Sequence, residues 1–131
     1  MVNTEGRRRI WAGRALTALA VLFLAFDATL KLLRLAPAIQ ATSELGYTAS
    51  VLVPLGLIEA ICLVAYLVAQ TSILGAVLWT GYLGGAVATQ VRVSNPLFSH
   101  VLFPVYVAAL LWGGLWLRDA RVRALLPLVS A

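Results

Sequence analysis

The chain has 131 residues, of which 62% are hydrophobic and only 11% are charged, and its formal net charge is +5. Soluble globular domains carry about 25% charged residues, so this composition excludes that class and indicates an integral membrane protein. The basic residues lie at the ends of apolar stretches and not along a polar face with interleaved aromatics, which argues against a nucleic-acid partner. A chain of this length has room for one domain, which we expect to cover residues 1–131.

Four apolar stretches are long enough to cross a hydrocarbon core of about 30 Å, which takes roughly 17–25 helical residues. They cover residues 12–35, 51–69, 73–91 and 101–117. We therefore predict an all-α protein, a four-helix bundle that spans the lipid bilayer.

The positions of the basic residues predict the topology. Seven arginines lie near the start of the first span or the end of the last span: Arg7, Arg8, Arg9, Arg14, Arg118, Arg121 and Arg123. The opposite side carries only three bases, Lys31, Arg34 and Arg92. By the positive-inside rule both termini are expected in the cytoplasm, in a multi-pass protein of the cell inner (cytoplasmic) membrane.

Two acids lie inside predicted spans, Asp27 in the first and Glu59 in the second. A charged side chain at the bilayer centre costs roughly 2.5–3.5 kcal/mol on insertion scales, so such residues usually face the bundle interior and a partner or ligand. Asp27 and Lys31 are four residues apart and can pair along the helix, while Lys31 and Arg34 reach toward the headgroups. Glu59 has no base within one turn, so its partner must come from another helix, from water or from its own proton.

Both acids lie eight residues inside the extracytoplasmic edge of their spans, or about 12 Å at 1.5 Å per residue. The same half of the bundle holds most other polar side chains of the third and fourth spans, namely Thr89, Gln90, Arg92 and His100. We therefore predict a polar pocket that opens toward the extracytoplasmic side, with Asp27 and Glu59 at its floor. Lys31, Arg92 and His100 are expected near its mouth. The alternative is a structural network that only orients the four helices.

The fourth span carries a second candidate feature around His100. Asn95 and Pro96 are typical of a helix start, which would place the first turn of this helix before His100. Pro104 would then remove the hydrogen bond to the His100 carbonyl and kink the helix. The freed carbonyl and the imidazole could handle protons or bind a carbonyl ligand there. The alternative is a solvated interfacial histidine.

Small residues form one face of the third span, where Gly81, Gly84 and Gly85 are spaced as in helix-packing motifs. Such residues let membrane helices approach closely. We expect this face to pack inside the bundle, and a contact with a second copy of the chain, giving a homo-oligomer, is the alternative.

One cysteine, Cys62, and one histidine do not make a disulfide, a metal-ligand cluster or a bis-His haem site. We expect no metal and no tightly bound cofactor.

Several blocks of the chain resemble the DoxX-like family of small four-helix bacterial membrane proteins. The matching blocks are Phe26-Asp27 with Lys31, LGY at 45–47, Gly56 with Glu59, TGYLGGAVAT at 80–89 with Arg92, SHVLFPVY at 99–106, LWGGL at 111–115 and LRD at 117–119. The resemblance covers residues 13–127 and implies a four-helix membrane bundle. Many relatives carry His where this chain has Gln90, a departure that affects any mechanism needing a proton acceptor at that position.

The resemblance also implies a function. The family takes its name from a membrane subunit of a thiosulfate:quinone oxidoreductase, and related proteins are linked to membrane oxidoreductase complexes that handle oxidative and thiol stress. A quinone in the pocket is then the expected ligand, with His100, Arg92 or Lys31 hydrogen-bonding its carbonyl and Glu59 or Asp27 passing the proton. The alternative is a noncatalytic structural or accessory subunit that anchors a larger membrane complex.

Overall fold

The computed structural model describes residues 3–126; positions 1–2 and 127–131, including Pro127 at the end of the expected resemblance, lie outside the described residues. Within this part the ordered elements are all helical: α1 (Thr4–Leu32), α2 (Ala36–Glu44), the 3-10 turn η1 (Ala49–Val51), α3 (Leu52–Leu67), α4 (Ser72–Arg92), the π-helical turn η2 (Leu97–Val101), α5 (Phe103–Arg118) and α6 (Ala120–Leu125). Four helical stretches are long and apolar enough to cross a membrane: Thr4–Leu32, Ala49–Leu67, Ser72–Arg92 and Leu97–Arg118. The predicted all-α, four-span architecture is confirmed.

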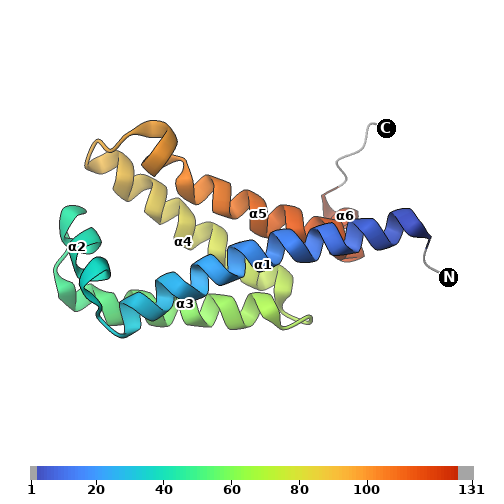
Figure 1. Ribbon diagram of the computed structural model, residues 1–131, viewed down its shortest axis with the longest axis horizontal. Coiled ribbons are helices and arrows are strands. Elements are labelled where there is room, and N and C mark those ends of the chain that lie inside the picture. Colours follow the sequence, from blue (N-terminus) through green and yellow to red (C-terminus); the bar gives the residue numbers. More distant parts are fainter. Residues whose placement is uncertain (1–2, 127–131) are drawn as a thin grey trace.

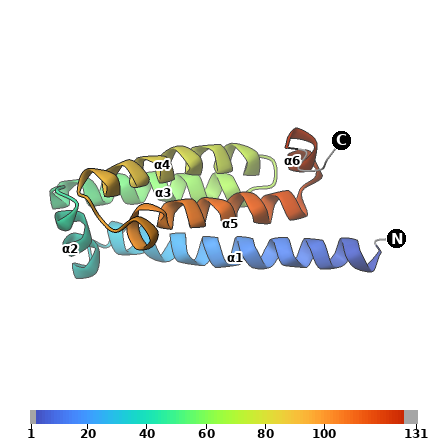
Figure 2. The same cartoon turned by 90° about the horizontal axis from the view of Figure 1, so that it is seen from above.

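The four long helices form a ring in which α1 packs on α3 and α5, and α4 closes the ring against the same two helices. Figures 1 and 2 show the start of α1, the α3–α4 turn and α6 at one end of the bundle, which we call the terminal end. The opposite end, which we call the loop end, holds α2, η1 and η2. The two ends of the described chain thus lie on the same side, and their cytoplasmic location stays a prediction from charge.

The first span differs most from its predicted bounds. Helix α1 begins at Thr4, because the side chain of Asn3 caps it by accepting a hydrogen bond from the Gly6 N–H at 2.7 Å. The helix ends at Leu32, and Arg34 takes a left-handed φ of 52° that breaks the helical path.

Helices α2 and α6 were not predicted, because both are too short to give a span signal. Pro37 lies in the first turn of α2, a position that suits proline, and Ala38 and Thr42 lie one turn apart and are buried against the bundle. Helix α6 is capped by Asp119, whose carboxylate accepts a hydrogen bond from the Arg121 N–H at 2.9 Å. Both elements cover an end of the bundle and do not cross it.

Close packing at the terminal end depends on glycines. A Cβ added at Gly13 would lie 2.7 Å from the Gly114 carbonyl oxygen, and one added at Gly114 would lie 2.9 Å from the Gly13 oxygen, so the backbones of α1 and α5 touch. A Cβ at Gly75 would overlap the backbone of Tyr66, so the absence of a side chain there lets α4 lie directly against α3. Tyr66 is fully buried and donates a hydrogen bond from Oη to the Leu111 carbonyl at 2.6 Å. Four helices are thereby held together at this end.

The glycines predicted to pack inside the bundle do not do so. No other part of the described chain comes within 4 Å of a Cβ placed at Gly81, Gly84 or Gly85, apart from the helix's own neighbouring backbone. The expectation of packing inside the bundle is therefore wrong for these three residues, and the contact with a second subunit stays a prediction. The spacing of small residues indicates only that one face of the helix has little side-chain bulk. It gives no information on what packs against that face.

Candidate functional site

Four side chains from three helices meet in what we call the lysine cluster: Asp27 and Lys31 on α1, Glu59 on α3 and Tyr82 on α4. Lys31 Nζ donates hydrogen bonds to Asp27 Oδ2 at 2.5 Å, to Glu59 Oε1 and to Tyr82 Oη at 3.1 Å. Tyr82 Oη in turn donates to Glu59 Oε1. The cluster thus joins α1, α3 and α4 through one ammonium group.

Exposure increases from one acid to the other across this cluster. The side chain of Glu59 is 0% exposed, that of Lys31 is 16% exposed and that of Asp27 is 36% exposed. The predicted pair of Asp27 with Lys31 is present, and Glu59 finds its partner on another helix. The expectation that Lys31 reaches toward the headgroups is wrong, because its ammonium turns inward to serve two carboxylates.

The charges of the cluster do not balance when every group is ionised, since two carboxylates face one ammonium. Glu59 Oε2 is buried and has no hydrogen-bond partner within residues 3–126. Burying a polar oxygen without a partner costs free energy. Protonation of one carboxylate would therefore balance the charges of the cluster.

A cavity of about 600 Å³ lies beside the lysine cluster at the loop end, within the range of roughly 300–1,000 Å³ that is usual for small-ligand sites. Asp27, Lys31 and Tyr82 form one polar patch of its wall, and Glu59 lies behind them and does not line it. A second polar patch comes from Tyr47, Thr89 and Gln90. Most of the remaining lining is apolar, including Phe23, Leu24, Leu83, Phe103, Pro104 and Val107.

The same glycines that fail to pack explain why the cavity exists. Gly81 and Gly85 line it, and a side chain at either position would project into open space. Gly84 lies on the same helix and is equally free of neighbours, but it does not line the cavity.

Arg92 does not stand at the mouth of the cavity, contrary to prediction. Its guanidinium donates to the Leu45 carbonyl at 2.5 Å and lies 5.5 Å from the ring of Tyr47. Arg92 therefore holds the loop that places Tyr47 in the cavity wall, and it does not line the cavity itself. Gln90 does line the cavity, and its side-chain oxygen accepts a hydrogen bond from Asn95.

His100 is also absent from the cavity wall, so its predicted position near the mouth is wrong. The side chain is exposed, and Nδ1 pairs with Ser99 Oγ at 2.7 Å. The helical path is interrupted at Leu102, as the proline suggested, and η2 gives way there to α5 with Pro104 in its first turn. The interruption turns Pro104 and Phe103 toward the cavity and leaves His100 outside it.

Two site residues, Tyr82 and Tyr47, were missed by sequence reasoning. Tyr82 lies within the glycine-rich block of the third span, which was interpreted only as a packing surface. The signal available was a buried acid without a local partner, which requires a donor from a neighbouring helix. Of the residues that the structure describes, no three or more His, Cys, Asp or Glu side chains gather as metal ligands.

Comparison with known proteins identifies the family. The model of the DoxX-like family matches residues 15–114, which include all four residues of the lysine cluster. No match was found among curated proteins or among solved structures. With four membrane-spanning helices and a family match over most of its length, this chain is a multi-pass integral membrane protein that belongs to the DoxX-like family.

Proposed function

We propose that this protein binds a small hydrophobic carbonyl ligand such as a quinone in the loop-end cavity, as a membrane component associated with an oxidoreductase system of the inner membrane. One observation carries the proposal: a cavity of about 600 Å³ with mostly apolar walls is bordered by an acid, an ammonium and a phenol that share hydrogen bonds. Ligand sites commonly combine apolar walls with a few placed polar groups in this way.

The polar groups suit a ligand that takes up protons as it gains electrons. Asp27 lines the cavity, is partly exposed and shares Lys31 with the buried Glu59. A proton held within this cluster can move to Asp27 and then to a reduced carbonyl oxygen, since general acids act over hydrogen-bond distances. Gln90 and Tyr47 supply further donors on the second polar patch. The electrons are supplied by a partner oxidoreductase subunit.

A pair of glycine variants tests this proposal. In lipid nanodiscs, the wild type should bind a quinone, and Gly85→Leu should weaken the binding at least tenfold because the new side chain fills the cavity. Gly84→Leu is the matched control, since it adds the same bulk one residue away and outside the cavity. Absence of binding by the wild type, or equal affinity of all three proteins, would refute the proposal.

A second candidate function is that of a noncatalytic subunit that anchors a larger membrane complex. The exposed small-residue face at Gly84 favours it, because small residues on membrane helices commonly let another helix pack closely. The same two variants separate the candidates. Loss of co-purifying subunits in Gly84→Leu, with an unaltered complex in Gly85→Leu, would support the anchor.

A further inference from the structure

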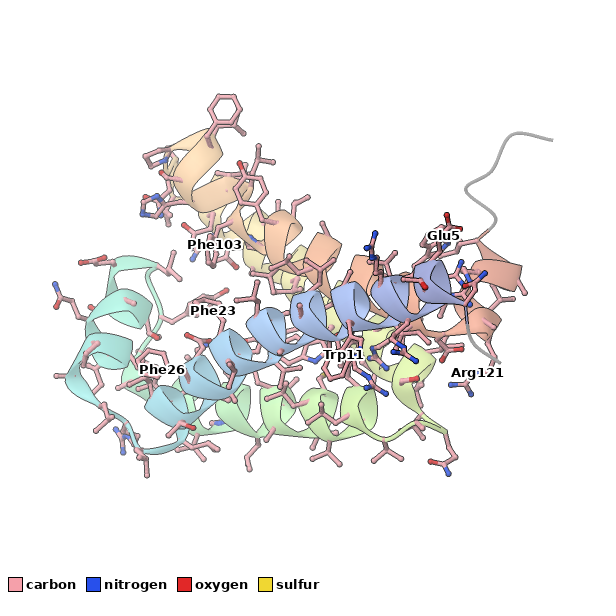
Figure 3. The ribbon with its side chains drawn as sticks, turned by 45° about the vertical axis from the view of Figure 1, so that its right-hand side comes forward. Glu5, Trp11, Phe23, Phe26, Phe103 and Arg121 are labelled. Atoms are coloured by element: carbon pink, nitrogen blue, oxygen red, sulfur yellow. The ribbon has the colours of Figure 1, made fainter. Side chains whose placement is uncertain are left out.

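Two phenylalanines lie where the cavity wall meets the outer surface of the bundle. Phe23 on α1 and Phe103 at the start of α5 both line the cavity, yet they remain 41% and 42% exposed. Their ring centroids are 5.2 Å apart at an interplanar angle of 70°. Figure 3 shows the two side chains pointing toward one another between α1 and α5. A residue that faces both the cavity and the surroundings marks the boundary between them.

The surroundings at this boundary are hydrocarbon. Phe23 lies nine residues before the end of α1 at Leu32, which is about 14 Å along the helix axis. A hydrocarbon core of about 30 Å therefore encloses this position. Where Phe23 and Phe103 face out of the bundle, their rings are therefore expected to meet lipid chains.

Helix α2 and the loop after it cover part of the side of the cavity that faces the loop end. Helix α2 contributes the buried residues Ala38 and Thr42 to the wall. The Thr42 carbonyl accepts a hydrogen bond from the Tyr47 N–H at 3.1 Å, and Arg92 holds the Leu45 carbonyl at 2.5 Å. Opening this side requires movement of a helix and its loop, whereas the gap between Phe23 and Phe103 can widen by a change of side-chain rotamer. Rotamer changes are much faster than movements of secondary structure.

We propose that the cavity is entered laterally from the bilayer between Phe23 and Phe103, and that its ligand is an amphiphile with a compact hydrogen-bonding head and a long apolar chain. The head lies at Asp27, Lys31 and Tyr82, and the chain leaves the protein between the two phenyl rings. Phe23 precedes Asp27 by about one helical turn, or about 6 Å along the axis, so the exit lies next to the polar patch. This inference rests on the proposed function and names the class of its ligand.

Two quinones with the same head test the inference, one with a long isoprenoid chain and one without a chain. Binding and release are measured in nanodiscs, with the long-chain concentration expressed per lipid. In the double variant Phe23→Trp/Phe103→Trp the larger rings narrow the exit, so association of the long-chain quinone should slow at least fivefold. Association of the chainless quinone should slow less than that of the long-chain quinone, because no chain has to pass between the rings. Leu22→Trp is the control, because Leu22 is 69% exposed on the same helix and does not line the cavity.

A second variant keeps the test decisive if the double tryptophan protein does not fold. Phe103→Ala widens the exit and should speed release of the long-chain quinone about fivefold, with the chainless quinone unaffected. Binding of both quinones that is unchanged in every variant overturns lateral entry and leaves the proposed function standing. Failure of the wild type to bind either quinone overturns both.

Discussion

The terminal end and the loop end of the bundle use glycine for opposite purposes. Gly13 and Gly114 remove side chains so that two backbones can touch, and Gly75 does the same against the backbone at Tyr66. At the loop end Gly81 and Gly85 also remove side chains, but the space is left open and becomes the cavity. The comparison shows that a small residue in a membrane helix leaves space beside the backbone. The rest of the fold decides whether another helix or a ligand occupies that space.

The polar groups of the two ends differ in the same sense. At the terminal end Tyr66 Oη donates to a backbone carbonyl, and Arg118 donates to Thr17 Oγ1 at 3.2 Å and lies over the Tyr66 ring. These groups hold helices in place. Of the residues that the structure describes, two buried side-chain atoms have no hydrogen-bond partner: Glu59 Oε2 in the lysine cluster and Trp79 Nε1 on α4. The polar groups of the terminal end thus hold helices together, whereas at the loop end an unpartnered carboxylate oxygen belongs to a cluster that borders a cavity.

The largest effect is expected at the loop end from Lys31→Met. Removing the ammonium leaves two carboxylates facing each other, and the loss of one partner of a buried ion pair typically costs roughly 3–5 kcal/mol. The free energy of unfolding, measured by denaturant titration in detergent micelles, should fall by that amount. The control adds Asp27→Asn and Glu59→Gln to Lys31→Met, which should recover most of the loss. A triple variant as unstable as the single one would show that Lys31 acts by packing and not by charge.

Adjacent glycines on α5 test the close packing of the terminal end. Gly114→Ala places a Cβ against the backbone of α1, and overpacking of this kind typically costs about 1–3 kcal/mol. Gly113→Ala meets only Leu16 Cδ1 at 3.8 Å, so its stability should be unchanged or slightly higher. In the same detergent, the melting temperature of Gly114→Ala should be lower than that of Gly113→Ala. Equal melting temperatures would mean that α1 and α5 do not touch at Gly114.

A smaller and more local effect is expected from Arg92→Gln at the loop end. The variant loses the hydrogen bond to the Leu45 carbonyl, which is exposed and contributes about 1 kcal/mol. Hydrogen exchange in α2 and in residues 45–47 should become faster, while α3 and α5 stay protected. Arg34→Gln is the control, an exposed base at the same end. Unaltered exchange in Arg92→Gln would remove its assigned role in holding the cavity wall.

An equally small effect is expected at the terminal end, where Asp119 caps α6. Hydrogen bonds from Arg121 hold the pKa of the Asp119 carboxyl below its ordinary value. Because the folded form lowers this pKa, the stabilisation is present above the ordinary pKa of about 3.9 and is lost as the pH falls through the lowered value. Asp119→Ala should cost about 1 kcal/mol in capping at neutral pH.

The indole N–H of Trp116 reports on that change, because it donates to the Leu126 carbonyl at 2.9 Å when α6 is docked. Its NMR resonance should shift on acidification in the wild type, and it should already be shifted at neutral pH in Asp119→Ala. A resonance that is the same in both proteins at every pH would contradict the role of the cap.

The sequence allowed prediction of those features that depend on averages along a helix or on counting residues. Four apolar stretches predicted the spans, and equal depth predicted that Asp27 and Glu59 lie at one level, where Lys31 now joins them. Features that depend on helix rotation and lateral position were not predictable. The contribution of Tyr82 and the placement of His100 outside the cavity both follow from how neighbouring helices turn toward each other. Local patterns in one chain do not encode that rotation.

Helix α1 is longer than the membrane is thick. Its 29 residues extend about 44 Å, or about 41 Å along the bilayer normal at a typical tilt of about 20°, against a hydrocarbon core of about 30 Å. With Leu32 near one edge of the core, the other edge falls close to Trp11, and the first turns project beyond the end of α5 (Figure 2). The three arginines at 7–9 thus lie on a helical arm, at the height where lipid phosphates are expected. Such an arm resists vertical displacement of the bundle and so fixes how deeply the lateral opening is immersed.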